Sequence, residues 1–315
     1  MYNLLNLLTA QGFGIPILIL LVIILLPSVI KKVKSILLTL IIIIIAAAGW
    51  LYWENEPRLV ETDIDLGLEK PITIAFLSDF HHNTTIPWAT DEAVRKCNNI
   101  EPDIIILGGD FKTHFDKSSL PDEFLEKLAK LNAKNIYYVW GNHDLFEETK
   151  KASEKMNDLG FKPLGNRTIL LENKLYLSGV DYEVPKKEIK ITSKEKIHYI
   201  NYSVIKMEKL LKNIPDGSKV IFVSHMPQNF MRDFYDLNVL KNKKILFLAG
   251  HTHGGQVVLH DKDREEIAQK RFHIDTLSGL TDKEGQPVYI SPGIGSSYFP
   301  LRFNAKPEVT VLNIK

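Results

Sequence analysis

Apolar residues form two kinds of run along this chain. Near its start, two long runs, GIPILILLVIILLPSVI and SILLTLIIIIIAAAGWLYW, flank the short basic stretch KKVK. Beyond residue 70 the runs are short, and helical patterns such as ATDEAVRKCNNI, LPDEFLEKLAKLN and FEETKKASEKMNDLG lie between several of them. Strands that alternate with helices predict an α/β layered domain. The predicted strands are ITIAFLS, DIIILGG, IYYVWG, LYLSGV, KVIFVSH, KILFLAG, QVVLH, PVYIS and EVTVLNI.

The two long runs predict a membrane anchor. As a helix, Ser35 to Trp53 would be ~28 Å long, close to the ~30 Å of bilayer hydrocarbon, and its aromatic end suits the membrane interface. We expect two transmembrane helices, about residues 4–30 and 35–53, joined by a turn at KKVK. Two alternatives stay open: one span with an interfacial segment, and a signal peptide cleaved after Ala48.

The rest of the chain is predicted as a linker followed by one domain. Residues 54–70 form the linker and domain entry, and residues 71–315 form the domain. Two segments without a regular pattern, 181–201 and 261–285, are predicted as excursions from the core. The second combines the charged DKDREE with the apolar FHIDTLSGL, so it is a candidate for substrate selection by an acyl chain; a solvated loop is the alternative.

Composition restricts the function further. Apolar residues make up 45% of the chain, which is ample for a core, and the net charge of +1 gives no general basic excess. A nucleic-acid partner is therefore not expected. The single cysteine, Cys97, excludes an internal disulfide framework and a cysteine-rich zinc site. Any metal site must be built from His, Asp, Glu and Asn.

Polar residues with oxygen or imidazole groups follow five of the predicted strands. They are Asp79 and His81, Asp110, Asn142 with His143 and Asp144, His225, and His251 with His253. Because parallel strands bring their carboxyl ends together, these side chains are expected at one place. Asp and His suit Mn, Fe or Zn. Two such ions ~3.5–4 Å apart form a clamp for the cleavage of a phosphate ester.

The order of these motifs resembles the calcineurin-like metallophosphoesterase family. The motifs are Asp-x-His, Gly-Asp, Gly-Asn-His-Asp, His and Gly-His-x-His, and they extend from Asp79 to His253. The form GHTHGGQ and the ending SPGIGSSYFPLRFNAKPEV resemble the membrane-associated or exported bacterial branch. The resemblance implies a four-layer α/β/β/α sandwich, with the site on loops at one edge of the sheets.

The resemblance also implies a role for each motif residue. Asp79, His81 and His253 would hold one divalent cation. Asn142, His225 and His251 would hold a second, and Asp110 would bridge the two; Mn is favoured over Fe or Zn. A metal-bound hydroxide would attack phosphorus directly. His143 would stay off the metals and protonate the leaving alkoxide, a contribution of roughly 10²–10⁴ in rate. Substrate-binding residues are not identified.

Three positions raise questions about this assignment. Many members extend the second motif to Gly-Asp-x-x-Asp or Asn, where this chain has Thr113. An acidic partner for His143 is not identified; Asp144 is adjacent but can point elsewhere. His82 is an extra imidazole that either supports the site or lies idle on the surface.

The sequence thus predicts a membrane-anchored phosphohydrolase, a phosphodiesterase or phosphatase, with a lipid or cell-envelope ester as substrate. An alternative enzyme is a UDP-diacylglucosamine pyrophosphate hydrolase of lipid A synthesis, whose substrate is cytoplasmic. A catalytically dead membrane-anchored binding module is the third hypothesis. Short loops rich in lysine stay on the cytoplasmic side, so Lys31, Lys32 and Lys34 predict a multi-pass protein whose catalytic domain lies outside the cytoplasmic membrane.

Overall fold

A computed structural model describes residues 14–113, 120–144, 149–171, 174–183, 186–188, 198–200, 202–233 and 237–315. The chain divides into two compact units, residues 1–53 and residues 54–315. Residues 4–13 of the predicted first span and most of the predicted excursion 181–201 lie outside the described residues.

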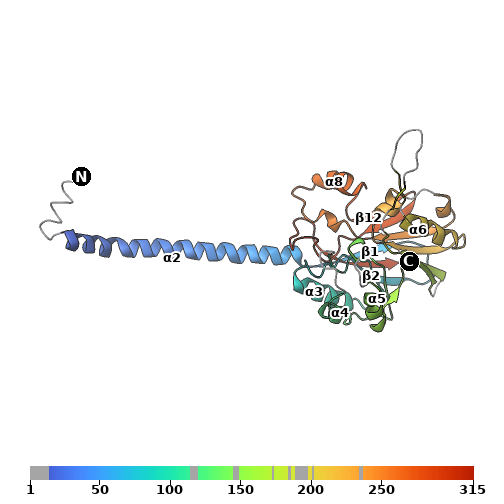
Figure 1. Ribbon diagram of the computed structural model, residues 1–315, viewed down its shortest axis with the longest axis horizontal. Coiled ribbons are helices and arrows are strands. Elements are labelled where there is room, and N and C mark those ends of the chain that lie inside the picture. Colours follow the sequence, from blue (N-terminus) through green and yellow to red (C-terminus); the bar gives the residue numbers. More distant parts are fainter. Residues whose placement is uncertain are drawn as a thin grey trace. The chain divides into compact units, whose positions relative to one another are not determined.

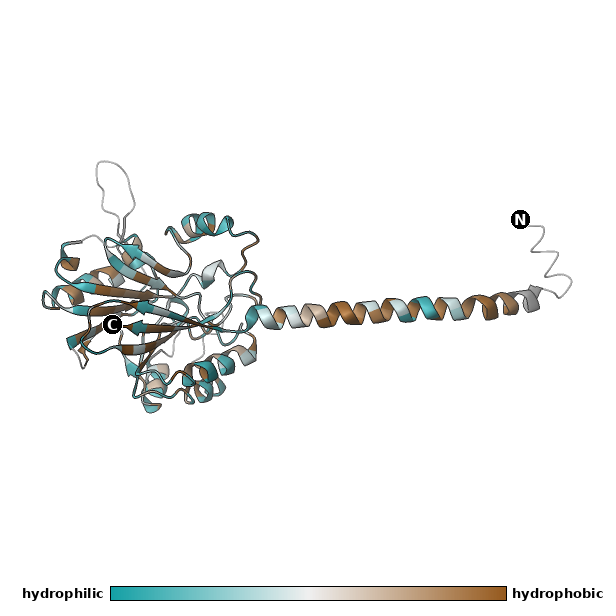
Figure 2. Cartoon of the chain, turned by 180° about the vertical axis from the view of Figure 1, so that it is seen from behind, coloured by the Kyte–Doolittle hydropathy of each residue, from teal (hydrophilic) through white to brown (hydrophobic). Residues whose placement is uncertain are grey.

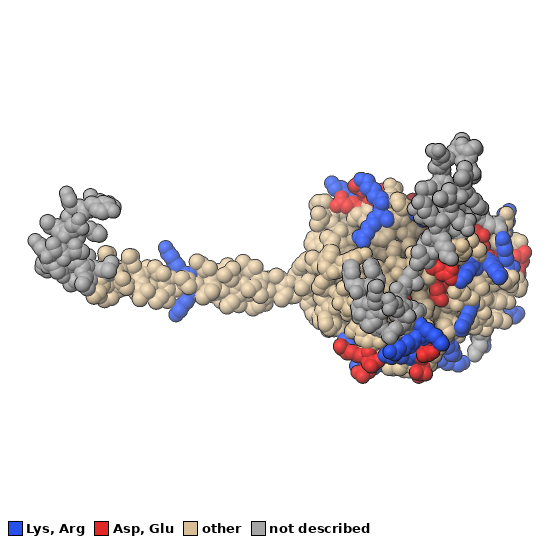
Figure 3. All heavy atoms as spheres, viewed as in Figure 1, with Lys and Arg blue, Asp and Glu red and all other residues tan. Residues whose placement is uncertain are grey.

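The described part of the first unit is helical. Helix α2 comprises Gly14–Asn55 and is apolar on all faces (Figures 1 and 2). Within the described residues, Ile19–Asn55 is the segment long and apolar enough to cross a membrane. The stretch KKVK, whose lysines are the charged side chains within Gly14–Trp53 (Figure 3), is itself helical, so the predicted hairpin is not confirmed. Lysine and valine continue a helix at little cost, and the stretch contains no glycine or proline that would end it.

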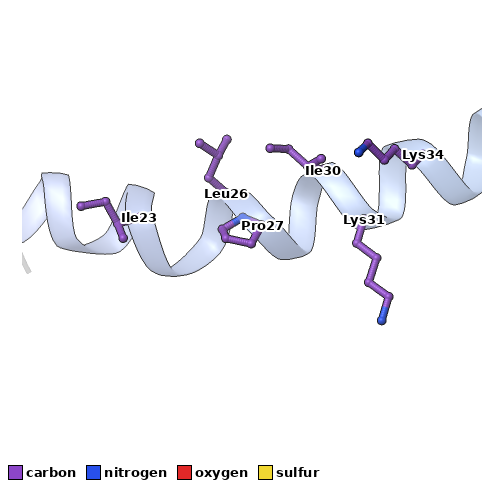
Figure 4. A pocket seen from close by; sticks show the side chains of 6 residues that line it. All are labelled: Ile23, Leu26, Pro27, Ile30, Lys31 and Lys34. Carbon is purple, nitrogen blue, oxygen red and sulfur yellow. The ribbon is translucent and has the colours of Figure 1, made fainter.

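Helix α2 contains Pro27 in its interior, beyond the first turn where proline is tolerated. Proline lacks the amide N–H that the helix needs, and its ring crowds the carbonyl four residues earlier. Pro27 lies one turn before Lys31 (Figure 4), in a shallow recess of the helix surface that is also lined by Ile23, Leu26, Ile30 and Lys34. The helix is therefore weakest just before its only charged stretch within Gly14–Trp53.

Two six-stranded sheets form the centre of the second unit (Figure 1). The first has the order β1-β14-β2-β3-β4-β5. Strands β2 to β5 run parallel, while β14 is antiparallel to β2 and parallel to β1. Their bounds are Arg58–Ile64 (β1), Ile72–Leu77 (β2), Ile104–Leu107 (β3), Asn135–Tyr138 (β4), Lys162–Pro163 (β5) and Glu308–Ile314 (β14).

The second sheet has the order β12-β13-β11-β10-β7-β6. Its four central strands are parallel, and the edge strands β12 and β6 are antiparallel to their neighbours. The bounds are Arg167–Leu170 (β6), Leu175–Val180 (β7), Lys219–Ser224 (β10), Lys244–Ala249 (β11), Gly279–Lys283 (β12) and Gln286–Ile290 (β13). A short antiparallel pair, β8 (Lys186–Glu188) with β9 (His198–Ile200), forms a third sheet.

Three buried layers of apolar side chains join the sheets to each other and to the helices. Alternation along β2 shows the arrangement: Ile74 and Phe76 face the second sheet, whereas Ala75 and Leu77 pack with the helices. The outer face of the first sheet carries α3 (Pro87–Asn98), α4 (Asp122–Leu128) and α5 (Thr149–Asp158). The outer face of the second carries α6 (Tyr202–Lys212) and α7 (Gln228–Met231). The predicted four-layer α/β/β/α sandwich is confirmed.

Three segments differ from their predictions. Residues 58–64, predicted as part of a linker, form the edge strand β1, which pairs with β14 although most of its side chains are solvent-accessible. The segment QVVLH is not a strand: of it, only Val257 makes an isolated bridge, to Phe303. The predicted excursion 261–285 contains α8 (Asp263–Ile267), a π-helical turn (Ala268–Phe272) and β12. Backbone pairing with distant strands, which leaves no local pattern, explains the first difference.

Glycine residues allow the loops at the strand ends to approach one another. A Cβ atom on Gly109 would lie 2.5 Å from the amide nitrogen of Gly141, and one on Gly250 would lie 2.2 Å from a carboxylate oxygen of Asp79. Gly109 also has a φ of +91°, which residues with side chains rarely adopt. The loops after β3, β4 and β11 can therefore meet only because glycine stands at these positions.

Gly109→Ala is expected to destabilise the protein more than Gly217→Ala. Both glycines have positive φ, which costs an alanine about 1–2 kcal/mol, but nothing lies within 4 Å of a Cβ atom on Gly217. The steric clash at Gly109 adds to the backbone cost and displaces the neighbouring Asp110. Thermal unfolding of the two variants measures the difference; equal decreases in Tm would show that the close approach to Gly141 is not a constraint.

Candidate metal centre

The five strand ends with polar residues meet at one place, and they come from both sheets. Strands β2, β3 and β4 lead to Asp79 and His81, to Asp110 and to Asn142, whereas β10 and β11 lead to the other histidines. The ligand atoms form two groups, and within each group all the atoms lie within 4.8 Å of one another. One group is Asp79, His81 and His253, and the other is Asp110, His225 and His251. A third such group combines His81 and Asp110 with His143. The tertiary structure thus brings together in these groups six of the seven predicted ligands, all except Asn142, and also His143.

The backbone at these positions is strained. Five of the seven predicted metal ligands have positive φ: Asp79 (55°), His81 (42°), Asp110 (55°), His251 (73°) and His253 (53°). Such residues cost of order 1–3 kcal/mol each and persist where surrounding contacts fix them. Here the contacts include amide donors to both carboxylates: His251 N lies 3.0 Å from both Asp79 carboxylate oxygens, and His143 N lies 2.8 Å from Asp110 Oδ1.

Hydrogen bonds orient two imidazole rings so that Nε2 faces the centre. The Nδ1 atom of His225 lies 2.8 Å from the Gly108 carbonyl oxygen, which can only accept, so Nδ1 carries the hydrogen. His81 Nδ1 lies 2.9 Å from Thr113 Oγ1. The Thr113 hydroxyl in turn lies 2.8 Å from that of Thr84, whose hydrogen goes to the Ser296 carbonyl at 2.6 Å. Thr113 therefore donates to Thr84 and accepts from His81.

Several polar atoms that face the centre have no hydrogen-bond partner among the described residues. They are His81 Nε2, His225 Nε2, Asp110 Oδ2 and Asn142 Oδ1. Asp110 Oδ2 lies 3.5 Å from His81 Nε2 and 3.0 Å from His225 Nε2, and His253 Nε2 lies 3.5 Å from Asp79 Oδ1. Buried polar atoms are almost always satisfied. Nitrogen and oxygen atoms that converge in this way fit divalent cations such as Mn, Fe or Zn, once His225 has released the proton on Nε2.

The electrostatics of the centre favour a cation. Burial lowers the pKa of His225, but the carboxylates of Asp110 and Asp79 outweigh burial and raise this pKa to about 10. Burial, reinforced by the charge of His225, lowers the pKa of His251 to about 3. Burial raises the pKa of Asp110, but His225 and His81 outweigh it and hold the pKa well below its ordinary value. Two buried carboxylates thus attract positive charge, and His251 and His253, whose pKa values burial lowers, can bind a metal without losing a proton.

The neighbours of the predicted ligands have different surroundings. His143 is buried, with its ring 4.9 Å from that of His81 and 6.1 Å from that of Tyr298. Asp144 points away from His143: its carboxylate accepts the amide hydrogens of Asp110, Phe111 and Gly141 at 2.7, 2.9 and 2.8 Å. Asp144 therefore holds the loops that carry Asp110 and His143.

His82 does not face the metal centre. Its ring stacks on Phe124 of α4 at 4.8 Å, and burial together with the charge of Lys127 lowers its pKa. Its amide donates to the Phe111 carbonyl at 3.0 Å. The stacking gives His82 a packing role rather than a place in the site.

The segment 261–285 contacts the centre but does not offer the expected apolar surface. Phe272 packs edge-on against His251 at 5.6 Å. Phe272, Ile274 and Leu277, predicted to line an acyl-chain site, are at most 5% exposed and belong to the core between the second sheet and its helices. That prediction is wrong for these three residues, because apolar side chains next to a sheet face are buried by packing.

Sequence reasoning missed contributions from the end of the chain. Residues 291–305 pass beside Asp79 and His253, and their amides pair with the loop after β2. Tyr298, beside His143, and its neighbour Phe299 are 53% and 47% exposed. Arg302 is completely buried and lies 3.2 Å from His253 Nδ1. A signal was present: Arg302 is the one charged residue between Ser291 and Ala305.

Comparisons with known proteins agree with this geometry. Residues 72–255 match the family model described as Calcineurin-like phosphoesterase. An uncharacterized metallophosphoesterase of Helicobacter pylori is 27% identical over 82% of this chain, and the match covers 64% of that protein. Phosphodiesterase YaeI of Escherichia coli is 26% identical, with 78% of this chain and 82% of that protein covered.

A third relative carries a membrane description. It is the bovine protein named "Transmembrane protein with metallophosphoesterase domain", which is 25% identical over 76% of this chain; the match covers 52% of that protein. The chain therefore spans about two thirds or less of the length of the Helicobacter and bovine relatives that it matches.

Metal binding is expected to strengthen as the pH rises. Below its pKa of about 10, His225 carries a proton that a cation at Nε2 must displace, so the affinity should rise about tenfold per pH unit for each proton released. Calorimetric Mn²⁺ titrations between pH 6.5 and 8.5, in buffers of different ionisation enthalpy, measure the affinity and the number of protons released. His225→Asn should flatten the dependence; an affinity independent of pH in the unmodified protein would contradict the expected proton exchange.

Proposed function

The chain belongs to the calcineurin-like phosphoesterase family, whose members hydrolyse phosphoesters, and we propose that this one is a two-metal enzyme anchored in a membrane that acts on a lipid or cell-envelope phosphate ester. The observation that carries the proposal is the convergence of unsatisfied Nε2 and oxygen atoms from both sheets on one buried point. Geometry of this kind has no role in packing, because it leaves buried polar atoms without partners.

The two groups of ligand atoms suggest how the cations are held. Asp79, His81 and His253 would hold the first. His225 and His251, together with Asn142, would hold the second, and Asp110 would bridge the two. The bridging role is supported by Asp110 Oδ2, which faces His81 from the first sheet and His225 from the second. The mixture of carboxylate and imidazole favours Mn, Fe or Zn over Mg or Ca, and we favour Mn.

The residues around the metals complete the chemistry. A pair of divalent cations supplies a strong nucleophile from water at neutral pH and stabilises negative charge on the ester oxygens. His143 is the candidate general acid: its backbone is fixed by Asp110 Oδ1 and its ring lies beside His81, at the rim of the centre. There it can protonate the leaving oxygen without binding a metal.

Helix α2 supports a membrane anchor. With 42 residues it is ~63 Å long, about twice the thickness of bilayer hydrocarbon. Both apolar halves can lie in one bilayer only if the chain turns between them, and Pro27 weakens the helix next to the lysines. We therefore retain the hairpin as the proposed membrane state, with Lys31, Lys32 and Lys34 on the cytoplasmic side. The name of the bovine relative supports the membrane location.

The rim of the centre supports a lipid substrate. Tyr298, Phe299 and Pro300 are exposed next to one another, and the Tyr298 ring faces His143. Exposed aromatic side chains suit contact with acyl chains and with the membrane interface. Because Tyr298 lies next to His143, the leaving group of a phospholipid-like ester would contact this apolar surface.

Asp110→Ala and His143→Ala are both expected to abolish hydrolysis, for different reasons. Loss of the bridging carboxylate should lower the metal content, whereas His143→Ala should retain the metals and slow the reaction by roughly 10²–10⁴, most for poor leaving groups. Elemental analysis and the turnover of aryl phosphate diesters with leaving groups of different acidity measure both effects. A loss of metal from His143→Ala would show that this residue is a ligand, and active protein with a single ion would exclude the two-metal mechanism.

The catalytic domain is expected outside the cytoplasmic membrane. Alkaline phosphatase fused after Glu54 should be active, and green fluorescent protein exported by the general secretory route at the same site should be dark. The three lysines between the apolar halves of α2 are the physical reason. The opposite pair of results would favour the cytoplasmic nucleotide-sugar hydrolase instead.

A further inference from the structure

The segment Ser291–Ala305 lies outside the residues that match the family model, yet it lines the first metal group. Its backbone pairs with the loop that carries Asp79 and His81: Ile294 N lies 2.9 Å from the Ser78 carbonyl, and Gly295 N lies 2.6 Å from the Asp79 carbonyl. A Cβ atom on Gly293 would lie 2.5 Å from that of Asp79. We call these fifteen residues the C-terminal strap.

Arg302 holds the strap through hydrogen bonds that its side chain donates to backbone carbonyls. Its side chain is completely buried, and its donors reach four backbone carbonyls: Nε to Gly295 at 3.0 Å, Nη1 to His253 at 3.2 Å and to Ala305 at 3.0 Å, and Nη2 to Pro292 at 2.8 Å. Within the described residues, no carboxylate lies within ion-pair distance of it. Burial lowers its pKa to about 10, so it remains charged at neutral pH.

A buried arginine in this position lowers the stability of the fold unless its hydrogen bonds stabilise a particular arrangement of the backbone. A buried charge outside ion-pair distance of a carboxylate costs on the order of several kcal/mol, which hydrogen bonds to dipoles and the more distant carboxylates of Asp79 and Glu308 only partly offset. A leucine or methionine would fill the same space without that cost. The planar guanidinium, in contrast, can hold carbonyls from several turns of one loop in a fixed arrangement.

The strap supplies partners to both histidines of the first metal group. His253 Nδ1 lies 3.3 Å from the Gly295 carbonyl, to which Arg302 also donates. When His253 Nε2 binds a metal, Nδ1 keeps its hydrogen and can donate it to Gly295. The Ser296 carbonyl ends the hydroxyl chain through Thr84 that fixes His81. Partners of this kind set the tautomer and orientation of metal ligands.

The side chains of the second metal group have partners outside the strap, whose Ser291 amide reaches only the backbone carbonyl of Ala249, two residues before His251. His225 is oriented by the Gly108 carbonyl at 2.8 Å, and His251 packs against Phe272. These contacts come from β3 and from the π-helical turn, and Arg302 touches neither histidine. The two halves of the centre therefore depend on different parts of the chain.

We propose that Arg302 is a positioning residue for the first metal ion, because it fixes the strap carbonyls that orient His253 and His81. The proposal rests on the two-metal function proposed above. Arg302→Gln is expected to weaken the binding of the first Mn²⁺ ion by about 10–100-fold, which is the usual effect of losing a hydrogen-bond partner of a metal ligand. The affinity for the second ion should be unchanged. Arg302→Lys should also weaken the binding of the first ion, since one ammonium group cannot donate hydrogen bonds to all four carbonyls.

The test is a Mn²⁺ titration of the full-length protein in detergent. Electron paramagnetic resonance counts free and bound ions, and the spin-coupled signal of a Mn pair reports occupation of both positions. Arg264→Gln is the matched control: Arg264 also donates to the strap, at the Asn304 carbonyl, but it lies on the surface. The control should bind both ions as the unmodified protein does.

A second variant guards against misfolding of Arg302→Gln. Thr84→Val removes the hydroxyl between Ser296 and Thr113 without leaving a buried charge, and it should weaken the same ion; Thr168→Val, which breaks a hydroxyl pair with Ser178 in the second sheet, should not. Thermal unfolding in a chelator checks that each variant folds.

The outcomes are distinct. Selective loss of one ion in both Arg302→Gln and Thr84→Val supports the proposal. Unchanged binding in both, or equal weakening of both ions in folded protein, overturns it while leaving the proposed function intact. Unmodified protein that binds fewer than two Mn²⁺ ions would overturn the two-metal function, and the proposal with it.

Discussion

The contact of Asp110 with two imidazoles, one from each sheet, is the interaction on which the site depends. Asp110 follows β3 in the first sheet; its Oδ2 lies 3.5 Å from His81 Nε2 and 3.0 Å from His225 Nε2, and His225 follows β10 in the second. His225 also donates to Gly108, so the ends of β3 and β10 are held together twice. The sandwich can close at this edge only if these polar groups are buried together, and a cation is the partner that would satisfy them.

This arrangement lowers the stability of the fold, and features of the surrounding loops offset part of the loss. Positive φ at Asp79, Asp110 and His251 is unfavourable for residues with side chains. Glycine at 109, 141 and 250 removes the Cβ atoms that would separate the loops. Asp144 then holds three amides at the loop bases. Such features are typical of sites where geometry is fixed for chemistry at the expense of folding energy.

The two halves of the centre differ in what supports them. The side-chain partners of the second group come from Gly108, directly after β3, and from the π-helical turn, whereas those of the first group include the C-terminal strap with its buried arginine. The strap also exposes Tyr298, beside His143, and the adjacent Phe299. One segment therefore connects the support of a metal position with the apolar rim where a lipid ester would approach.

The sequence by itself determined the fold class and the identity of the site motifs. Short apolar runs, five of which lead to Asp, Asn or His residues of the site, show both facts locally, because the side chain at a strand end is read directly from the chain. It could not reveal β1, whose pairing with β14 joins residues 250 positions apart (Arg58 with Glu308), or the burial of Phe272 and Ile274. Nor could it show that Thr113 fixes a tautomer or that Arg302 supports His253. These roles depend on distances between loops that are remote in sequence, and only the closed sandwich decides them.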